Sequence, residues 1–158
     1  MIKQKRQGQL IVVSGPSGAG KDTIVENVIQ RGNNIWLSVS ATSRKPREKE
    51  QEGVNYFYLE KEEFEEKIQK GYFLEYAMYA DNYYGTPKEK IKEKLDQGID
   101  VVLVIEIQGA KKIKELVPEA IFIFIMPPSL KELLKRLKNR KTESKEKSLN
   151  VSALLIKE

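Results

Sequence analysis

The chain has 158 residues, with 32% charged residues, a formal net charge of +5, and neither cysteine nor histidine. This length fits one domain that can bury a core, and the missing cysteines exclude disulfides and thiolate zinc sites. No apolar run approaches the roughly 20 residues of a membrane span, so we expect a cytoplasmic protein without a membrane partner. Without histidine, any chemistry depends on lysine, arginine, carboxylates and hydroxyls.

Apolar runs alternate with helical periodicities, which predicts βαβ units around a parallel sheet. Strands are predicted over residues 9–14, 35–40, 54–59, 72–79, 100–107 and 121–126. Helices are predicted over residues 22–31, 62–70 and 110–117, between Pro87 and Gly98, and after Ser129. The continuous apolar runs within 100–107 and 121–126 are typical of strands covered on both faces. The strand-rich interval 54–84 breaks the alternation and predicts a small inserted lobe.

Two helix starts carry capping signals. Thr86 and Glu89 around Pro87 form a capping-box pattern, with Thr86 as the N-cap residue. Ser129 and Glu132 form a second cap before a leucine-rich helix. We therefore expect a helix to begin directly after each of these hydroxyl residues.

A phosphate-binding loop is predicted where the first strand meets the first helix. Its Gly-x4-Gly-Lys spacing lets backbone N–H groups converge on an anion at a helix N-terminus, and the lysine adds a mobile positive charge. A glycine-rich turn that only joins strand to helix is the alternative. The loop consists of Gly15, Pro16, Ser17, Gly18, Ala19, Gly20, Lys21, Asp22 and Thr23.

A second polar loop is predicted over residues 41–53, after a strand, and it contains the run Thr42-Ser43-Arg44-Lys45-Pro46-Arg47. Together with the P-loop and the run Asn82-Tyr83-Tyr84-Gly85-Thr86, it makes the chain resemble the guanylate kinase family. The resemblance covers nearly the whole chain in the family's order, up to about Glu143.

The resemblance implies an α/β fold: a P-loop three-layer α/β/α parallel sheet with a small inserted β-rich GMP-binding lobe and a helical lid. Residues 9–40 and 86–128 would form the core, 41–85 the lobe and 129–147 the lid region of a single domain that is incomplete at its C-terminus. The implied activity moves the γ-phosphoryl group of ATP to GMP, giving ADP and GDP. Mg²⁺ would accompany ATP, with Thr23 as its ligand.

The resemblance also assigns residues to these roles. The residues of the P-loop, Gly15 to Thr23, would bind ATP. The catalytic set would be Lys21, Arg44, Arg136 and Arg140. The residues that would bind GMP are Ser40, Arg44, Arg47, Tyr56, Glu75, Tyr84, Gly85, Thr86 and Glu106. The alternatives to these binding roles are purely structural: the tyrosines would pack in the core, and Arg136 would lie on a solvated helix face.

Three departures from the family pattern bear on activity. Asp22 stands where a hydroxyl residue is expected after the lysine, and we expect it to point away from the phosphates. Val104 replaces a second acidic residue. Beyond Glu143 a further lid arginine, a strand and the C-terminal helices have no counterpart, so we expect an exposed sheet edge, lower stability and weaker turnover.

Other functions were weighed against phosphoryl transfer to GMP. A non-catalytic guanylate-kinase-like module would hold phosphopeptides in the GMP pocket, which the intact Lys21 argues against. A P-loop kinase for another small phosphate is disfavoured by Glu75 and by residues 82–86. Nucleic-acid binding has the least support, because no RNA motif or helix-turn-helix pattern accompanies the positive charge. The sequence leaves the oligomeric state open.

Overall fold

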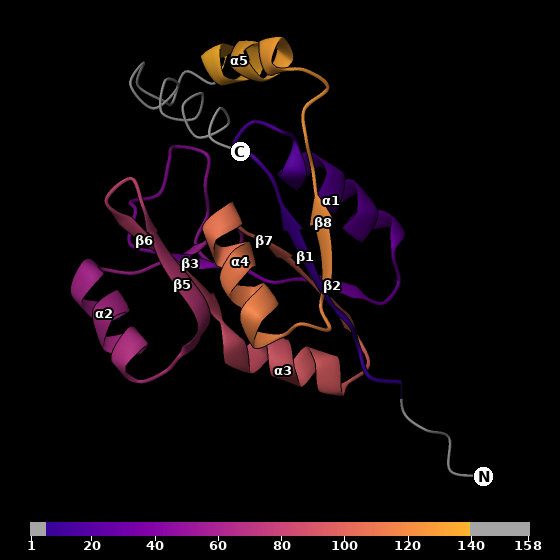
Figure 1. The fold of residues 1–158 in the computed structure, drawn as a ribbon. Coiled ribbons are helices and arrows are strands. Elements are labelled where there is room, and N and C mark those ends of the chain that lie inside the picture. The colour runs from indigo at the N-terminus through magenta and orange to yellow at the C-terminus, as the bar shows by residue number, and fades with distance from the viewer. Residues whose placement is uncertain (1–5, 140–158) are drawn as a thin grey trace.

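The computed structural model describes residues 6–139, whose elements form two sheets and the helices around them (Figure 1). The larger sheet has four parallel strands in the order β2-β7-β1-β8, which confirms the predicted parallel sheet. Its central strand β1 pairs with β7 on one side and with β8 on the other. The strands are β1 (Leu10–Ser14), β2 (Ile35–Leu37), β7 (Asp100–Val104) and β8 (Ile121–Phe124).

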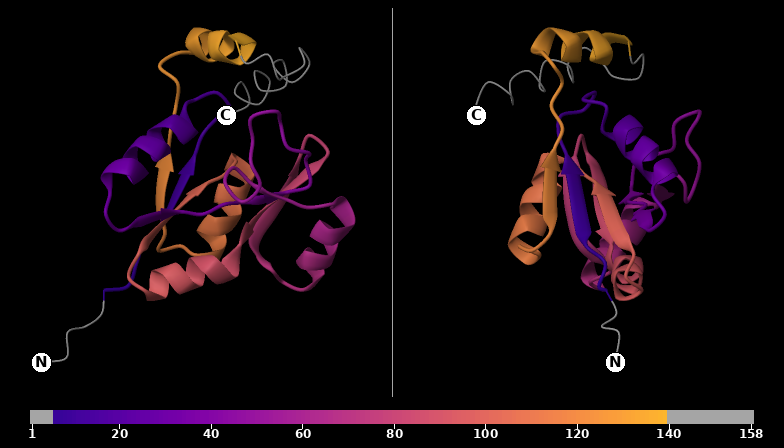
Figure 2. Two further views of the ribbon diagram at one scale, coloured as in Figure 1. Left: turned by 180° about the vertical axis from the view of Figure 1, so that it is seen from behind. Right: turned by 90° about the vertical axis from the view of Figure 1, so that its right-hand side faces the viewer.

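Helices cover both faces of the larger sheet, as the edge-on view in Figure 2 shows. Helix α1 packs on one face, where Val25 joins a cluster with the apolar side chains of β1 and β7. Helices α3 and α4 pack on the other face through Ile91 and Ile113. The three-layer α/β/α arrangement is therefore confirmed. These helices are α1 (Lys21–Arg31), α3 (Lys88–Asp96) and α4 (Ile107–Leu116).

The smaller sheet has the order β4-β3-β6-β5 and, with α2, forms what we call the small lobe. Strand β6 runs antiparallel to both β3 and β5. The lobe has its own core around Phe64, which is fully buried and stacks on Phe73 and Tyr83 at ring-centroid distances of 4.4 and 5.1 Å. The elements are β3 (Ala41–Thr42), β4 (Phe57–Tyr58), α2 (Lys61–Gln69), β5 (Phe73–Tyr79) and β6 (Asn82–Pro87).

Several predicted strands are shorter than expected, among them the strand predicted over 121–126, which ends at Phe124. The strand predicted over 35–40 ends at Leu37, and β3 then forms inside a stretch predicted as loop. The strand predicted over 54–59 is reduced to Phe57–Tyr58. The strand predicted over 100–107 ends at Val104, so Glu106 is the N-cap residue of α4 and not the end of a strand.

The capping box predicted at Thr86 is wrong. Strand β6 continues to Pro87, which precedes α3 as its N-cap residue without a side-chain hydrogen bond. Thr86 pairs with Glu75 in the β5–β6 ladder, and its hydroxyl donates to Glu75 Oε1 at 2.6 Å. The Thr86 hydroxyl therefore bonds the carboxylate across the β5–β6 ladder and does not cap α3.

The second predicted cap is confirmed at the start of α5 (Leu130–Asn139). The N–H of Glu132 donates to Ser129 Oγ at 3.1 Å. Helix α5 lies apart from the other helices, beyond the carboxyl ends of β1 and β8 (Figure 1).

Strand β8 is not covered on both faces, so that prediction is wrong. Among the described residues β8 pairs only with β1, and its four side chains are 37–51% exposed. Within residues 6–139 no helix has the length and apolar character needed to cross a bilayer.

Replacing Phe64 with alanine should destabilise the small lobe, because two stacked rings lose their partner and a cavity remains. We expect the free energy of unfolding to fall by about 3–5 kcal/mol. Urea unfolding followed by circular dichroism measures this change. The control is Val54→Ala in the same lobe, where the side chain is 63% exposed and the change should stay within about 0.5 kcal/mol. Equal effects of the two substitutions would contradict the lobe core described above.

Candidate active site

The loop between β1 and α1 has the backbone conformation of an anion cradle. Gly15, Gly18 and Gly20 all have positive φ, at 146°, 85° and 96°. A Cβ on Gly15 would lie 2.1 Å from the carbonyl oxygen of Ile125, so only glycine fits there. Such conformations let successive backbone N–H groups converge on an anion, and α1 begins directly afterwards at Lys21.

Lys21 is buried inside this loop, with 8% of the residue exposed. Its ammonium donates to the carbonyl oxygens of Gly15 at 2.6 Å and of Pro16 at 3.2 Å. These neutral acceptors hold the charge over the loop, and phosphate oxygens would be stronger acceptors for the same donor.

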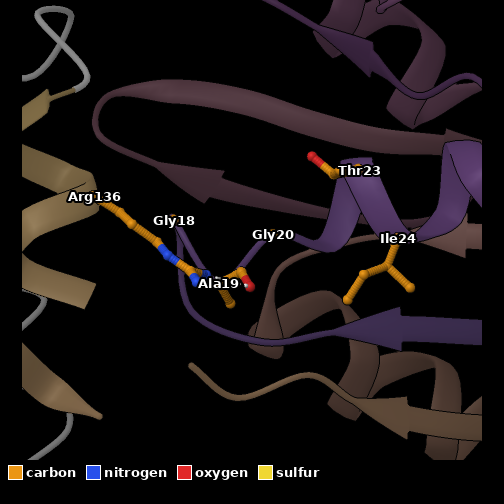
Figure 3. Close-up of a pocket in the computed structure, with 6 residues that line it drawn as sticks. All are labelled: Gly18, Ala19, Gly20, Thr23, Ile24 and Arg136. Atoms are coloured by element: carbon orange, nitrogen blue, oxygen red, sulfur yellow. Dashed lines mark hydrogen bonds between the residues drawn. The ribbon is translucent and has the colours of Figure 1, made fainter. Parts of the chain in front are cut away.

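Helix α5 lies on the other side of this loop from α1 (Figure 3). Arg136 extends toward the loop and its Nη1 donates to the carbonyl oxygen of Ala19 at 3.3 Å, while its Nε donates to Glu132 at 2.9 Å. An open pocket of about 470 Å³ lies between the helix and the loop. Its lining residues are Gly18, Ala19, Gly20, Thr23, Ile24 and Arg136.

A second cationic group, Arg44, is held by Glu50. The Nη1 and Nη2 atoms of Arg44 donate to the two carboxylate oxygens of Glu50 at 3.0 and 2.9 Å. Glu50 also accepts from the N–H of Arg47 at 2.8 Å and from the hydroxyl of Tyr58 at 2.9 Å. Burial opposes ionisation, but these hydrogen bonds lower the pKa of Glu50 to about 2. Burial of Arg44 likewise opposes its charged form, but its hydrogen bonds to Glu50 and Tyr84 raise its pKa above the usual value.

Two tyrosine rings adjoin Arg44. The guanidinium carbon lies 5.5 Å from the ring centroid of Tyr56, and the Tyr84 ring meets that of Tyr56 edge-on at 6.0 Å. Burial, then the neighbouring Tyr84 and the charges of Asp22 and Glu106, raise the pKa of Tyr56 to about 12, while Arg44 opposes them. Asp22 lies in the first turn of α1 and Glu106 is the N-cap residue of α4, so charges from two elements of the core influence this tyrosine of the small lobe.

A buried carboxylate, Glu75, lies on β5 with 6% of the residue exposed. Burial raises its pKa, and the hydrogen bond from Thr86 and the charge of Lys112 oppose that rise. Gly109 on α4 leaves room for the carboxylate, because a Cβ there would lie 2.9 Å from Glu75 Oε2. The carboxylate oxygens have lone pairs left for N–H donors of a ligand.

Known proteins share this sequence and fold. The family model named Guanylate kinase matches residues 7–158. The guanylate kinase of Clostridioides difficile (strain 630) is 59% identical over 139 residues, which are 88% of this chain and 68% of that protein. The guanylate kinase of Prochlorococcus marinus (strain MIT 9312) is 51% identical over 142 residues, 90% of this chain and 77% of that protein.

A solved structure agrees with these relatives. The crystal structure of guanylate kinase from Anaplasma phagocytophilum matches with a TM-score of 0.75 and 32% sequence identity, and covers 96% of this chain and 86% of that chain. The chain belongs to the guanylate kinase family. The resemblance carried by the P-loop and by the two arginine and tyrosine motifs is thereby confirmed, and with it the enzyme class. A non-catalytic module is not favoured.

At the junction of β1 and α1, the structure brings the predicted P-loop residues, Lys21 and Arg136 together. Arg140 lies outside the described residues. Asp22 is exposed on the first turn of α1, and its charge acts on Tyr56. Its orientation away from bound phosphates stays a prediction.

In the small lobe, the structure gathers Arg44, Tyr56 and Tyr84, and it pairs Glu75 with Thr86. Other predicted residues have mainly backbone or packing contacts. Arg47 is exposed, and its N–H holds Glu50. The carbonyl oxygen of Ser40 accepts from the N–H of Phe57 at 2.9 Å. Gly85 is buried against Phe64 and Phe73, and Glu106 is the N-cap residue of α4. The contacts of all these residues with GMP stay predictions.

Sequence reasoning missed four residues of this site. Glu50 and Tyr58 orient Arg44, and Gly109 and Lys112 surround Glu75. Glu50 follows Arg47 by three residues in a charged loop, so the sequence could have predicted an ion pair within that loop. Gly109 and Lys112 carry no such signal, because their partners lie more than 30 residues away in the chain.

Glu50 should stabilise the protein in a pH-dependent way. Because its pKa is lowered from 4.5 to about 2, its contribution is fully present above about pH 4.5 and is lost as the pH falls toward 2. Glu50→Gln should therefore lower the free energy of unfolding by about 3 kcal/mol at pH 7 and by about half as much at pH 3. Urea unfolding of both proteins at the two pH values measures the difference. A difference that does not change with pH would contradict the charged pairing.

Proposed function

We propose that this chain transfers the γ-phosphoryl group of ATP to GMP, giving ADP and GDP. The observation that carries the proposal is the presence of two cationic clusters, one in the core at the start of α1 and one in the small lobe. One is the P-loop with Lys21, and the other is Arg44 with its tyrosines. The charge of Asp22, beside Lys21, acts on Tyr56 in the small lobe, which supports their closeness. A donor and an acceptor phosphate need such a pair of sites in line with each other.

The P-loop would hold the ATP phosphates. Its backbone N–H groups and the start of α1 favour anions, and Lys21 would exchange its carbonyl acceptors for phosphate oxygens. We assign Arg136, together with Arg140, to the charge on the transferring phosphoryl group, since Arg136 already reaches the loop at Ala19. Arginines in this role contribute about 10³–10⁵ in rate.

The small lobe would hold GMP. The guanidinium groups and phenol hydroxyls suit a phosphate dianion, which accepts bidentate and single hydrogen bonds. Glu75 would accept from the guanine N1–H and N2 amino group, which adenine does not offer, and Thr86 would help to hold the carboxylate. The complete proposed acceptor site is Ser40, Arg44, Arg47, Tyr56, Glu75, Tyr84, Gly85, Thr86 and Glu106.

The donor set at the start of α1 fits Mg²⁺, which prefers hard oxygen ligands. Thr23, whose hydroxyl is such a ligand, lines the pocket beside the P-loop. Residues 6–139 contain no cluster of three acidic or other metal-binding side chains. That matches an ion held by few protein groups together with substrate phosphates, and we propose Thr23 as its protein ligand. Bound Mg²⁺ would neutralise charge between the β- and γ-phosphates.

We also propose which residues form each part of the domain. Residues 9–40 and 86–128 would form the core, 41–85 the GMP lobe, and 129–147 the lid. Closure of lobe and lid over both nucleotides would exclude water and suppress hydrolysis of ATP.

A coupled ADP-release assay on the purified chain tests the function. We expect turnover with GMP and little with AMP or without an acceptor. Glu75→Gln should reduce kcat/KM for GMP by about 10²-fold or more, because the site loses a charged acceptor for two donors. Glu62→Gln, an exposed carboxylate on α2, is the matched control and should leave the rate unchanged. ADP release that is independent of the acceptor would contradict the proposal.

Gly109→Ala separates stability from GMP binding. Alanine favours a helix by about 1 kcal/mol relative to glycine, so α4 should not lose stability. Its Cβ, however, would push the Glu75 carboxylate from its place. We expect the affinity for GMP to fall about tenfold, equivalent to one good hydrogen bond, with ATP affinity unchanged. Calorimetric titration with each nucleotide measures both, and an unchanged GMP affinity would refute this role of Gly109.

A further inference from the structure

Lys112 joins the core to the small lobe at one point. It lies in the middle of α4, and its ammonium donates to the carbonyl oxygen of Tyr76 in β5. The same ammonium lies 4.9 Å from the ring centroid of Tyr76, in a cation–π contact. Among the described residues β5 is the last strand of its sheet on this side, and Lys112 gives one of its backbone carbonyl groups a donor from outside the sheet.

The residue that Lys112 holds is next to Glu75. In a strand, neighbouring residues point to opposite faces. Tyr76 is accordingly exposed toward Lys112, and Glu75 turns inward beside α4, where its Oε2 approaches Gly109. The lysine thus anchors the strand position adjacent to the buried carboxylate.

Lys112 also acts on Glu75 through its charge. Two groups of the described chain oppose the effect of burial on this carboxylate: the Thr86 hydroxyl from β6 and the ammonium of Lys112 from α4. Gly109 of α4 lies beside the Glu75 carboxylate but carries no charge. Because Lys112 is exposed, solvent screens its field, so the effect should be moderate and should weaken in salt.

We propose that Lys112 is a positioning residue for the acceptor base: it fixes β5 against α4 and so holds the Glu75 carboxylate in place for a purine that presents two N–H donors. This inference rests on the proposed GMP site, because Glu75 is the group through which Lys112 acts. Lys112 itself would not touch the nucleotide.

The test measures kcat/KM for GMP from pH 5.5 to 8.5 in the wild-type chain, Lys112→Met, Lys112→Arg and Lys114→Met. In Lys112→Met the acid limb should move to higher pH, with a loss of about three- to tenfold near pH 6 that is smaller at pH 8 and in high salt. Lys112→Arg should restore the wild-type limb, because it keeps the charge and a donor. Lys114→Met removes a charge from the same helix and should match the wild type. The ionisation of the GMP phosphate is common to all four proteins and cancels in the comparison.

The outcomes separate this inference from the proposed function. A wild-type chain without GMP-dependent turnover would refute the proposed function itself. An active wild type with superimposable acid limbs for Lys112→Met and Lys114→Met would overturn the role of Lys112 alone. A loss in Lys112→Met that is equal at every pH and is not restored by arginine would also overturn it, because a merely structural contact would behave in that way. Thermal unfolding of each variant verifies that the fold is retained.

Discussion

Strand β1 pairs with a neighbouring strand on each side, and this arrangement determines where the other parts of the site lie. Its backbone is hydrogen-bonded to β7 on one side and to β8 on the other, and both ladders continue to its carboxyl end, where Val13 accepts from Ile105 and Ser14 from Ile125. The glycine loop therefore leaves the sheet between two fixed strands, and Gly15 has no room for a side chain. The chain that follows β7 starts α4 beside the small lobe. In parallel sheets ligands bind outside the carboxyl ends of the strands for this reason.

Buried and half-buried charges are the second constraint on this site. A carboxylate or guanidinium taken from water must receive hydrogen bonds or an opposite charge. Arg44 and Glu50 satisfy each other within one loop, whereas Glu75 depends on groups from β6 and α4. The first arrangement belongs to the lobe alone. The second couples the lobe to the core, which makes the carboxylate sensitive to how the two are packed.

The sequence predicts best what depends on neighbours in the chain. The parallel sheet, the P-loop and the cap at Ser129 follow from local periodicity and spacing, and the structure has them. Thr86 and β8 were misjudged because their surroundings decide them. Thr86 has a carboxylate across the ladder, and within residues 6–139 β8 pairs on one side only and is exposed despite its apolar run. Lys112 could not be found from sequence, since nothing near it in the chain indicates a contact 36 residues away.

The pairing of Arg44 with Glu50 has a consequence for the thermodynamics of binding. A free arginine side chain has many rotamers, and a ligand that immobilises it loses part of its binding free energy to that ordering. In this chain the guanidinium is already immobilised by Glu50 and lies against Tyr56 before any anion arrives. The conformational entropy of this side chain is therefore lost during folding. An anion that meets Arg44 encounters a rigid receptor, and its association should depend more on desolvation than on induced fit.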